Sequence, residues 1–302
     1  MTEISTAESY TIAPTGNDDG IMPSDYDVTD GKPLPETAVE QFQDDGVICL
    51  RGVVSKSIID ILRQEADDAV ANPSAEARFV TTPENSKIFY YEFNLWQRYP
   101  ELKQVLFKSR IADLAMTLMR SQAVSLHYTN TFVKDGGAID KPTPWHEDAS
   151  YHRIIGPNAI ALFLAYDEMP AETTLKYKQG SHLKTDHIYM ASTFTKGEEY
   201  GDWMEDHVPM PSQDELDRRF RTIYWPVKPG DVLAFTQRTL HAGPANTLPF
   251  RRHATSFNVI GDGARYDARP GPVDAPGGID PGLAHGSVPV GANFPSLRGQ
   301  LI

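Results

Sequence analysis

The features that the sequence lacks exclude several classes of protein. Its 302 residues contain one cysteine, so no intrachain disulfide can form, which is typical of a reducing cytoplasm. The apolar runs, such as residues 159–165, are far too short to cross a bilayer, so we expect no membrane partner. The N-terminal MTEISTAESY has neither a basic start nor an apolar stretch, so we expect no secretory signal. These absences predict a soluble cytoplasmic protein.

Positive charge is also scarce. The chain has 28 Lys and Arg residues against 41 Asp and Glu residues, which gives a formal net charge of −13. Basic residues form no cluster beyond short pairs, so we expect no nucleic-acid partner. The same balance argues against a highly anionic substrate and favours solubility. A homo-oligomer remains a possible assembly of this chain.

The order of the sequence patterns predicts an α+β fold. Residues 1–33 are polar and read as a mobile N-terminal arm or an extended wrap, and a single domain is expected over residues 34–262. Helical patterns come first and short strand-like runs follow, which indicates a barrel or a sandwich. The expected helices are 36–45, 57–71, 100–107 and 110–119, and the expected strands are 47–50, 123–133, 159–166, 173–177, 221–226, 232–235 and 254–260.

Two segments interrupt or follow this pattern. Residues 192–220 form a charged insertion with several aromatic residues and a predicted helix at 214–220. A segment of this length is either a lid over a functional site or a solvated excursion, and both readings stay open. Residues 263–302 contain many Gly and Pro residues and predict an irregular C-terminal tail.

Two of the nine histidines have neighbours that suggest chemistry. His146 and Asp148 are two residues apart in Trp-His-Glu-Asp, so in an extended strand their side chains project to the same side. An imidazole and a carboxylate on one side supply two ligands of a 2-His-1-carboxylate metal site. This pair alone is a weak signal, because it arises often by chance.

A second segment strengthens the metal-site interpretation. The stretch WPVKPGDVLAFTQRTLHAGPANTLPFRRHATSFNV contains a turn, an apolar strand and then His241, and Arg252 follows eleven residues later. Strand pairing that brings His241 beside His146 and Asp148 would complete three ligands and leave other metal positions open. A buried Arg252 on the next strand would bind the far carboxylate of a dicarboxylic acid.

With these motifs the sequence resembles the phytanoyl-CoA dioxygenase family of iron(II)/2-oxoglutarate oxygenases over residues 36–260. The resemblance includes FQDDGVICLRGVVSKSIIDILRQEADD, the His-x-Asp motif, TLKYKQGSH, PGDVLAF, and His241 with Arg252. It implies a double-stranded β-helix, a jelly-roll or cupin-like barrel with flanking helices. It also implies that His146, Asp148 and His241 bind Fe(II), that Arg252 binds the co-substrate 2-oxoglutarate, and that O2 is consumed.

The resemblance implies an enzyme that oxidises a small organic substrate and releases succinate and CO2. Hydroxylation is the expected outcome, although the family also performs desaturation, cyclisation and endoperoxide formation. The carboxylate Asp148 is present, so halogenation is not expected. The Gln-Gly-Ser-His at 179–182 and the Glu-Thr-Thr at 172–174 depart from the family's usual residues, which puts analogy with its known substrates in doubt. We expect a natural-product intermediate of secondary metabolism.

Further candidates rest on strand alternation alone. His127, Thr129 and Thr131 share one side of their strand, which either faces the barrel interior and 2-oxoglutarate or is an ordinary half-buried strand face. Ser256 lies on the same side of its strand as Arg252 and is a further candidate for co-substrate binding.

Two readings from other classes compete with an oxygenase. A redox-inactive zinc hydrolase or isomerase would use the same three ligands, but it has no use for Arg252. A non-catalytic barrel that binds a small molecule would not require the complete set of His146, Asp148 and His241. Both alternatives keep the same barrel.

Overall fold

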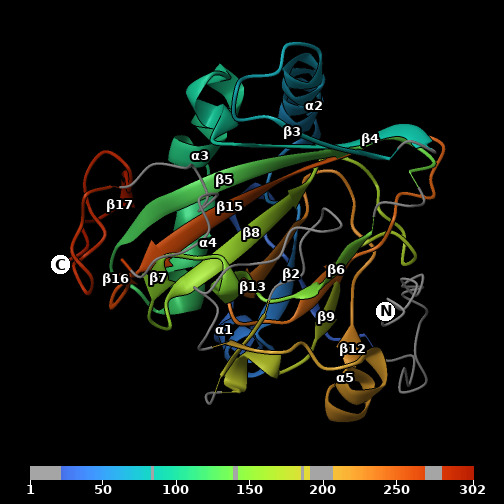
Figure 1. Ribbon diagram of the computed structural model, residues 1–302. Coiled ribbons are helices and arrows are strands. Elements are labelled where there is room, and N and C mark those ends of the chain that lie inside the picture. Colours follow the sequence, from blue (N-terminus) through green and yellow to red (C-terminus); the bar gives the residue numbers. More distant parts are fainter. Residues whose placement is uncertain (1–21, 83–84, 139–141, 185–186, 191–206, 269–280) are drawn as a thin grey trace, which may run out of the picture.

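A computed structural model describes residues 22–82, 85–138, 142–184, 187–190, 207–268 and 281–302. Its largest element is a nine-stranded mixed sheet that runs through the molecule (Figure 1). In sheet order its strands are β1 (Asp25–Asp27), β2 (Val47–Arg51), β13 (Val232–Thr236), β8 (Ala159–Ala165), β15 (Arg252–Gly261), β5 (Val124–Lys134), β4 (Asn85–Phe93) and β3 (Arg78–Thr82), and β17 (Ser296–Arg298) also pairs with β5.

A smaller sheet lies against one face of the large sheet. Its order is β12 (Thr222–Ile223), β9 (Lys176–Lys178), β14 (His241–Gly243) and β6 (Thr143–His146). Apolar side chains of both sheets form one buried cluster, in which Phe163 and Leu233 of the large sheet pack with Tyr177 and Ile223 of the small sheet. We call this surface of the large sheet its inner face. Two short pairs complete the strands, β10 (Ile188–Tyr189) with β11 (His207–Val208), and β16 (Arg265–Tyr266) with β7 (Ile154–Ile155).

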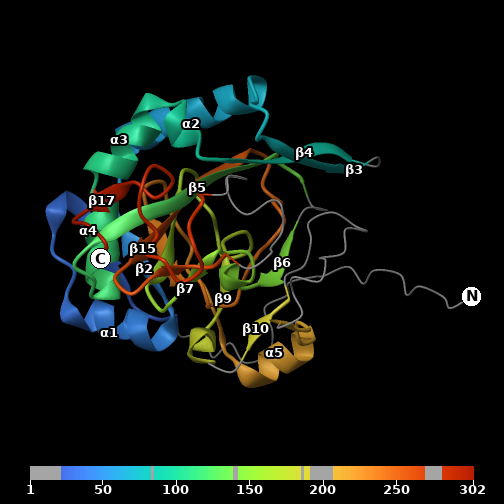
Figure 2. The ribbon, with the colours of Figure 1, turned by 60° about the vertical axis from the view of Figure 1, so that its left-hand side comes forward.

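Helices cover the other face of the large sheet, as Figure 2 shows from the side. They are α1 (Glu36–Asp45), α2 (Lys56–Ala71), α3 (Pro100–Lys108) and α4 (Ile111–Met119), whereas α5 (Gln213–Arg219) lies near the small sheet. In α2 the buried residues Ile59, Leu62, Ala66 and Ala69 recur at intervals of three or four, so they form one stripe along the helix. Burial of such stripes holds the helices on the sheet.

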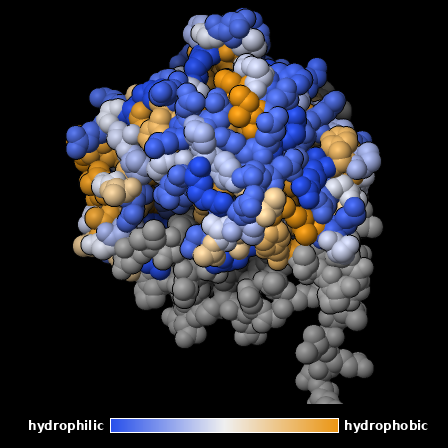
Figure 3. Space-filling view, turned by 90° about the horizontal axis from the view of Figure 1, so that it is seen from above, coloured by the Kyte–Doolittle hydropathy of each residue, from blue (hydrophilic) through white to orange (hydrophobic). Residues whose placement is uncertain are grey.

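The surface at the top of Figure 1 is mainly polar. Seen from above, the molecule is mainly hydrophilic, with small hydrophobic patches that are separate from one another (Figure 3). None of the helices in the described ranges has the length and apolar character needed to cross a membrane.

The expected α+β class is confirmed, and the helices follow their predicted ranges closely. Two strand predictions are too long, because the runs at 173–177 and 221–226 contribute only the short strands β9 and β12. Of the predicted arm or wrap, residues 25–27 lie along the body as an extended edge strand that pairs parallel with β2. Of the tail at 263–302, β16 and β17 pair with the body. Residues 1–21 lie outside the described residues, as do residues 192–206 of the predicted insertion at 192–220.

Candidate metal centre

Strand pairing brings the two sequence-distant histidines together. β6 and β14 run antiparallel, and His146 and His241 are direct partners in this ladder. Their ring centroids are 4.1 Å apart. Asp148 follows β6, and its Oδ1 lies 3.6 Å from Nε2 of His146 and 3.8 Å from Nε2 of His241. One ligand atom from each residue can therefore converge, since all three atoms lie within 4.8 Å of one another.

Hydrogen bonds orient both imidazoles for metal binding. Nδ1 of His146 lies 2.8 Å from the carbonyl oxygen of Pro144, and Nδ1 of His241 lies 3.0 Å from that of Thr239. A carbonyl oxygen only accepts, so each Nδ1 carries the proton and donates. The lone pair of each Nε2 is then directed toward Asp148, which is the arrangement that a ligating histidine needs.

Burial keeps both rings neutral. The side chains of His146 and His241 are 10% and 8% exposed. Loss of hydration lowers the pKa of each imidazole to about 4, and in His146 the neighbouring His241 ring adds to this effect. Protons compete less with a metal for imidazoles of low pKa, so both rings remain available as ligands at neutral pH.

These lowered pKa values predict that the metal-free protein loses stability in acid. An unfolded histidine titrates near 6.5, so between pH 6.5 and about 4 the unfolded chain binds more protons than the folded chain, and stability rises with pH. For one histidine the full shift corresponds to roughly 3 kcal/mol. Urea unfolding of the metal-free protein across this range measures the slope, which should be shallower in His241→Gln. Equal slopes in the two proteins would contradict the assignment.

Aromatic side chains enclose the His241 side of the centre. The ring of Phe235 on β13 lies 4.5 Å from that of His241, and Tyr177 on β9 stacks on His241 at 6.1 Å. Tyr177 is fully buried and Phe235 is 3% exposed. These contacts fix the His241 ring and exclude water from one side of the site.

Two buried basic side chains, Arg252 and Lys134, lie on the inner face. Burial, and secondly the charge of Arg252, hold the pKa of Lys134 well below its usual range. Arg252 and Lys134 are direct partners across β15 and β5, and they are 7% and 4% exposed. Arg252 donates to the carbonyl oxygens of Thr173 and Pro244 but forms no ion pair with any residue in the described ranges. Burial lowers its pKa to about 10, so it stays charged at neutral pH. Lys134 was missed by the sequence analysis, because one lysine in a strand gives no local signal.

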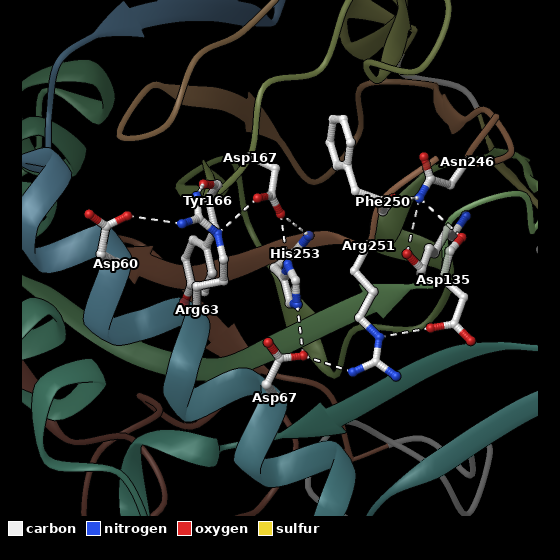
Figure 4. A network of polar contacts seen from close by, with 11 residues as sticks. Asp60, Arg63, Asp67, Asp135, Tyr166, Asp167, Asn246, Phe250, Arg251 and His253 are labelled. Carbon is white, nitrogen blue, oxygen red and sulfur yellow. Dashed lines mark hydrogen bonds and ion pairs between the residues drawn. The ribbon is translucent and has the colours of Figure 1, made fainter. Parts of the chain in front are cut away.

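The side-chain alternation of β15 separates Arg252 from its neighbour. Arg251 turns to the helical side, where it donates to Asp135 and Asp67 over 2.8 Å each. Figure 4 shows this network, in which His253 lies between Asp167 and Asp67. Strand β15 is thus attached to α2 at the position next to Arg252, and the predicted choice of Arg252 over Arg251 agrees with this arrangement.

The threonines proposed to face the co-substrate do not line this site. Thr131 is opposite Thr255 on β15, and their hydroxyls hydrogen-bond over 2.7 Å. The hydroxyl of Tyr166 bonds the same Thr255 over 2.6 Å. Thr129 lies two residues from Thr131 on the same side of β5. This side also carries Val133, which belongs to the core under the helices, so the expectation for Thr129 and Thr131 is wrong.

A bulge accounts for His127. Asn258 pairs with Tyr128, but the next residue, Val259, pairs with Leu126, so His127 is an extra residue in β5. Its ring packs 5.0 Å from that of His152 and 6.0 Å from that of Phe294. It does not reach the Arg252 end of the strand, where the co-substrate was expected.

The inner side of β5 instead presents Tyr128, which the sequence analysis missed. Its hydroxyl lies 2.8 Å from Nε2 of His152, and Nδ1 of His152 lies 3.2 Å from Oε1 of Gln237. Nε2 of Gln237 donates to the carbonyl oxygen of Gly156 over 3.1 Å, so Oε1 is the acceptor for His152. His152 must then accept at Nε2, and Tyr128 donates to it. The oxygen of Tyr128 therefore keeps its acceptor capacity.

Tyr128 also lies close enough to Asp148 to sense its charge. Burial, and secondly the negative charge of Asp148, hold the pKa of Tyr128 well above its usual range. Ser256, as expected, shares the Arg252 side of β15, directly opposite Asn130. The amide oxygens of Asn130 and Asn258 are buried without a hydrogen-bond partner. The inner face therefore carries a polar patch next to the three candidate ligands.

Two buried imidazoles and a carboxylate whose ligand atoms converge fit the 2-His-1-carboxylate class of metal site. The family model of phytanoyl-CoA dioxygenase (PhyH) matches residues 42–254. The chain therefore belongs to the phytanoyl-CoA dioxygenase family and is an enzyme of that class. No protein in a search of curated proteins matches it.

Solved structures share the fold at low identity. The non-heme alpha ketoglutarate dependent carbocyclase SnoK from nogalamycin biosynthesis is 21% identical, with a TM-score of 0.68 over 87% of this chain and 96% of that chain. The epimerase SnoN, solved with Fe3+, alpha ketoglutarate and nogalamycin RO, is 22% identical, with a TM-score of 0.68 over 87% and 98%. EctD from S. alaskensis, solved with 2-oxoglutarate and 5-hydroxyectoine, is 20% identical, with a TM-score of 0.61 over 79% and 80%.

Proposed function

We propose that this protein is an iron(II)- and 2-oxoglutarate-dependent dioxygenase that hydroxylates a small organic substrate. The observation that carries the proposal is the convergence of His146, Asp148 and His241, together with the buried Arg252, which donates to the carbonyl oxygen of Pro244 directly after the strand of His241. Two facing sheets with helices outside support a double-stranded β-helix as its fold. Membership in the phytanoyl-CoA dioxygenase family supports the same assignment.

The three converging residues fit Fe(II). Two neutral Nε2 atoms and one carboxylate oxygen supply three ligands of the kinds found in non-haem iron sites, and each imidazole is held through Nδ1 by a backbone carbonyl. When bound, the iron supplies activation of O2. The protein's part is to hold the ligands and, through Phe235 and Tyr177, to keep water away from His241.

The positive end of the inner face fits a dicarboxylate co-substrate. Arg252 is buried and charged and forms no ion pair with any residue in the described ranges, an arrangement that is costly without a nearby anion. A carboxylate of 2-oxoglutarate supplies this charge, and the fork of Arg252 can bind it through two N–H groups. A zinc hydrolase or isomerase gives no role to Arg252, which favours the oxygenase over that alternative.

The polar patch around Tyr128 is the proposed binding site for the substrate. The patch lies beside Asp148, and the Arg252–Lys134 pair lies six residues along β5 at the other end of the inner face. We propose a small natural-product intermediate that offers a hydrogen-bond donor to the hydroxyl oxygen of Tyr128. SnoK and SnoN, which share the fold, carry names from the biosynthesis of a natural product.

Tyr128→Phe should lower coupled turnover without affecting the metal. Loss of one hydrogen bond of about 1 kcal/mol corresponds to a fall of roughly fivefold in kcat/KM for the substrate. Affinity for Fe(II) and KM for 2-oxoglutarate should stay unchanged. Tyr166→Phe is the matched control, because its hydroxyl bonds Thr255 on the helical side. An equal loss of kcat/KM in the two variants would show that Tyr128 does not contact the substrate.

The proposed activity is tested by a substrate screen. The metal-free enzyme is loaded anaerobically with Fe(II) and 2-oxoglutarate, and candidate natural products are added with air. The proposal expects succinate to rise with one class of compound in the iron-loaded enzyme and to stay at background in a zinc-loaded sample. Product formation with zinc and without consumption of 2-oxoglutarate would establish the hydrolase or isomerase instead.

A further inference from the structure

The residue between the first two candidate ligands is a fully buried carboxylate. Glu147 follows His146 and precedes Asp148, and its side chain is 0% exposed. The ring of His146 and the carboxylate of Asp148 converge on one side, and Glu147 makes its contacts elsewhere. A buried carboxylate is costly unless it is paired and hydrogen-bonded, so its partners must compensate.

Glu147 has three such partners. Its Oε2 accepts from Nζ of Lys184 over 2.9 Å and from Nε of Arg238 over 3.1 Å. Its Oε1 accepts from the backbone N–H of Tyr189 over 2.7 Å. The side chain of Lys184 is itself only 5% exposed. The contact with Lys184 thus lies inside the protein, where ion pairs are weakly screened, whereas Arg238 is 27% exposed.

Arg238 extends this contact to the third candidate ligand. It stands one residue before Thr239, whose carbonyl oxygen accepts from Nδ1 of His241. Its Nε holds Glu147, and its Nη2 donates to the carbonyl oxygens of Lys184 and His187. One buried carboxylate therefore connects the chain segment of His146 and Asp148 with the segment that orients His241.

The same carboxylate holds a third stretch of chain, which we call the docking segment and define as Lys184 and residues 187–190. Glu147 binds it at Lys184 and at the amide of Tyr189, and Arg238 binds two of its carbonyl groups. Within the segment, Ile188 pairs with His207 of β11. The docking segment is thus attached to both ligand-bearing segments through Glu147 and Arg238.

We propose that Glu147 is a positioning residue that couples occupancy of the metal centre to the order of the docking segment. The inference rests on the proposed metal centre and adds that metal binding there is coupled to the docking segment. A metal fixes the spacing of His146, Asp148 and His241, which fixes Glu147 and Arg238 and hence the docking segment. Because coupling is reciprocal, loosening the docking segment lowers the affinity for metal by the same factor.

The test compares Glu147→Gln with the wild-type full chain. The amide keeps the size of the side chain but removes the charge that faces Lys184 and Arg238. Cobalt(II) is the probe, since its visible spectrum reports ligand geometry and its binding needs no turnover. We expect a 10- to 100-fold loss of cobalt affinity, the range found for residues that support metal ligands. We also expect metal loading to slow hydrogen exchange at the Tyr189 amide in the wild type but not in the variant.

Glu92→Gln is the matched control. Glu92 is 1% exposed, accepts from Tyr90 and pairs with Arg98 over 2.9 Å, but it lies on β4 opposite Thr131, on the helical side. Both variants should lose thermal stability, and only Glu147→Gln should lose cobalt affinity and the exchange effect. Equal cobalt affinity in Glu147→Gln and the wild type would overturn the inference.

Lys184→Met provides a second route if Glu147→Gln does not fold. It keeps the apolar stem and removes one cation from Glu147, so it should reproduce the loss of cobalt affinity in weaker form. No change in either readout would also overturn the inference. A wild-type protein that binds no cobalt at all is a different result, because it contradicts the metal centre of the proposed function.

Discussion

His241→Ala should abolish both metal binding and turnover. The substitution removes one of three converging ligand atoms and leaves His146 and Asp148, which together hold a divalent ion far less tightly. We expect an affinity for Fe(II) at least 100-fold lower and no succinate above background. Anaerobic titration with Fe(II) and a 2-oxoglutarate consumption assay measure the two quantities. His146→Ala should behave in the same way, because the two residues are direct partners in one ladder.

His182→Gln is the control for this prediction. Nε2 of His182 lies 2.9 Å from the carbonyl oxygen of Gln43 at the end of α1. The substitution removes a histidine that is not one of the converging residues, so metal affinity should stay near that of the wild type. Retained activity in His241→Ala, or an equal loss in His182→Gln, would show that the three ligands are wrongly assigned.

Arg252→Lys should raise the requirement for 2-oxoglutarate strongly. Lysine keeps the charge but loses the planar fork that binds a carboxylate through two N–H groups. Imperfect replacement of one partner in a buried charge pair costs about 2 to 5 kcal/mol, so KM for 2-oxoglutarate should rise roughly 30-fold or more. Affinity for Fe(II) should change little, because the residue is not a ligand. Steady-state kinetics and an anaerobic iron titration separate the two effects.

Arg251→Lys is the control, because it alters the adjacent residue on the other side of β15. Arg251 is 39% exposed and binds Asp67 and Asp135 on the helical side (Figure 4). Partly exposed ion pairs contribute about 1 kcal/mol or less, so the effect on 2-oxoglutarate should be small. A larger effect for Arg251→Lys than for Arg252→Lys would mean that β15 is one residue out of register.

The three converging residues were predictable because short-range rules determine most of their geometry. A two-residue spacing in a strand places His146 and Asp148 on one side, and the apolar strand before His241 identifies the segment that pairs with them. Arg252 was chosen because the resemblance to the family implies an arginine about eleven residues after the last histidine ligand. The class of fold followed from helical patterns in the first part of the chain and strand patterns in the second.

The lining of the inner face was predicted one residue out of register. The run AVSLHYTNTFV has polar and aromatic residues on both sides, so its pattern does not distinguish the core side of the sheet from the inner side. The bulge at His127 depends on pairing with β15, which no local pattern reveals. Thr129 and Thr131 were therefore chosen, whereas the structure places Tyr128 and Asn130 on the inner face.

The roles of charged residues whose partners are distant in the chain could not be predicted from the sequence either. Lys134 lies opposite Arg252 across the strand pair. Glu147 accepts a hydrogen bond from Arg238, which is 91 residues away along the chain. Each looks like an ordinary strand residue by itself. Only long-range pairing makes them buried, and burial is what gives a single charge a large effect.

Labelled dioxygen tests the central claim most directly. The iron-loaded enzyme is incubated with 2-oxoglutarate, a substrate from the screen and labelled O2, and the succinate is analysed by mass spectrometry. The account predicts one labelled oxygen atom in succinate, formed in the wild type and absent in His241→Ala. Unlabelled succinate, or product formed while 2-oxoglutarate remains intact, would contradict an iron- and 2-oxoglutarate-dependent dioxygenase.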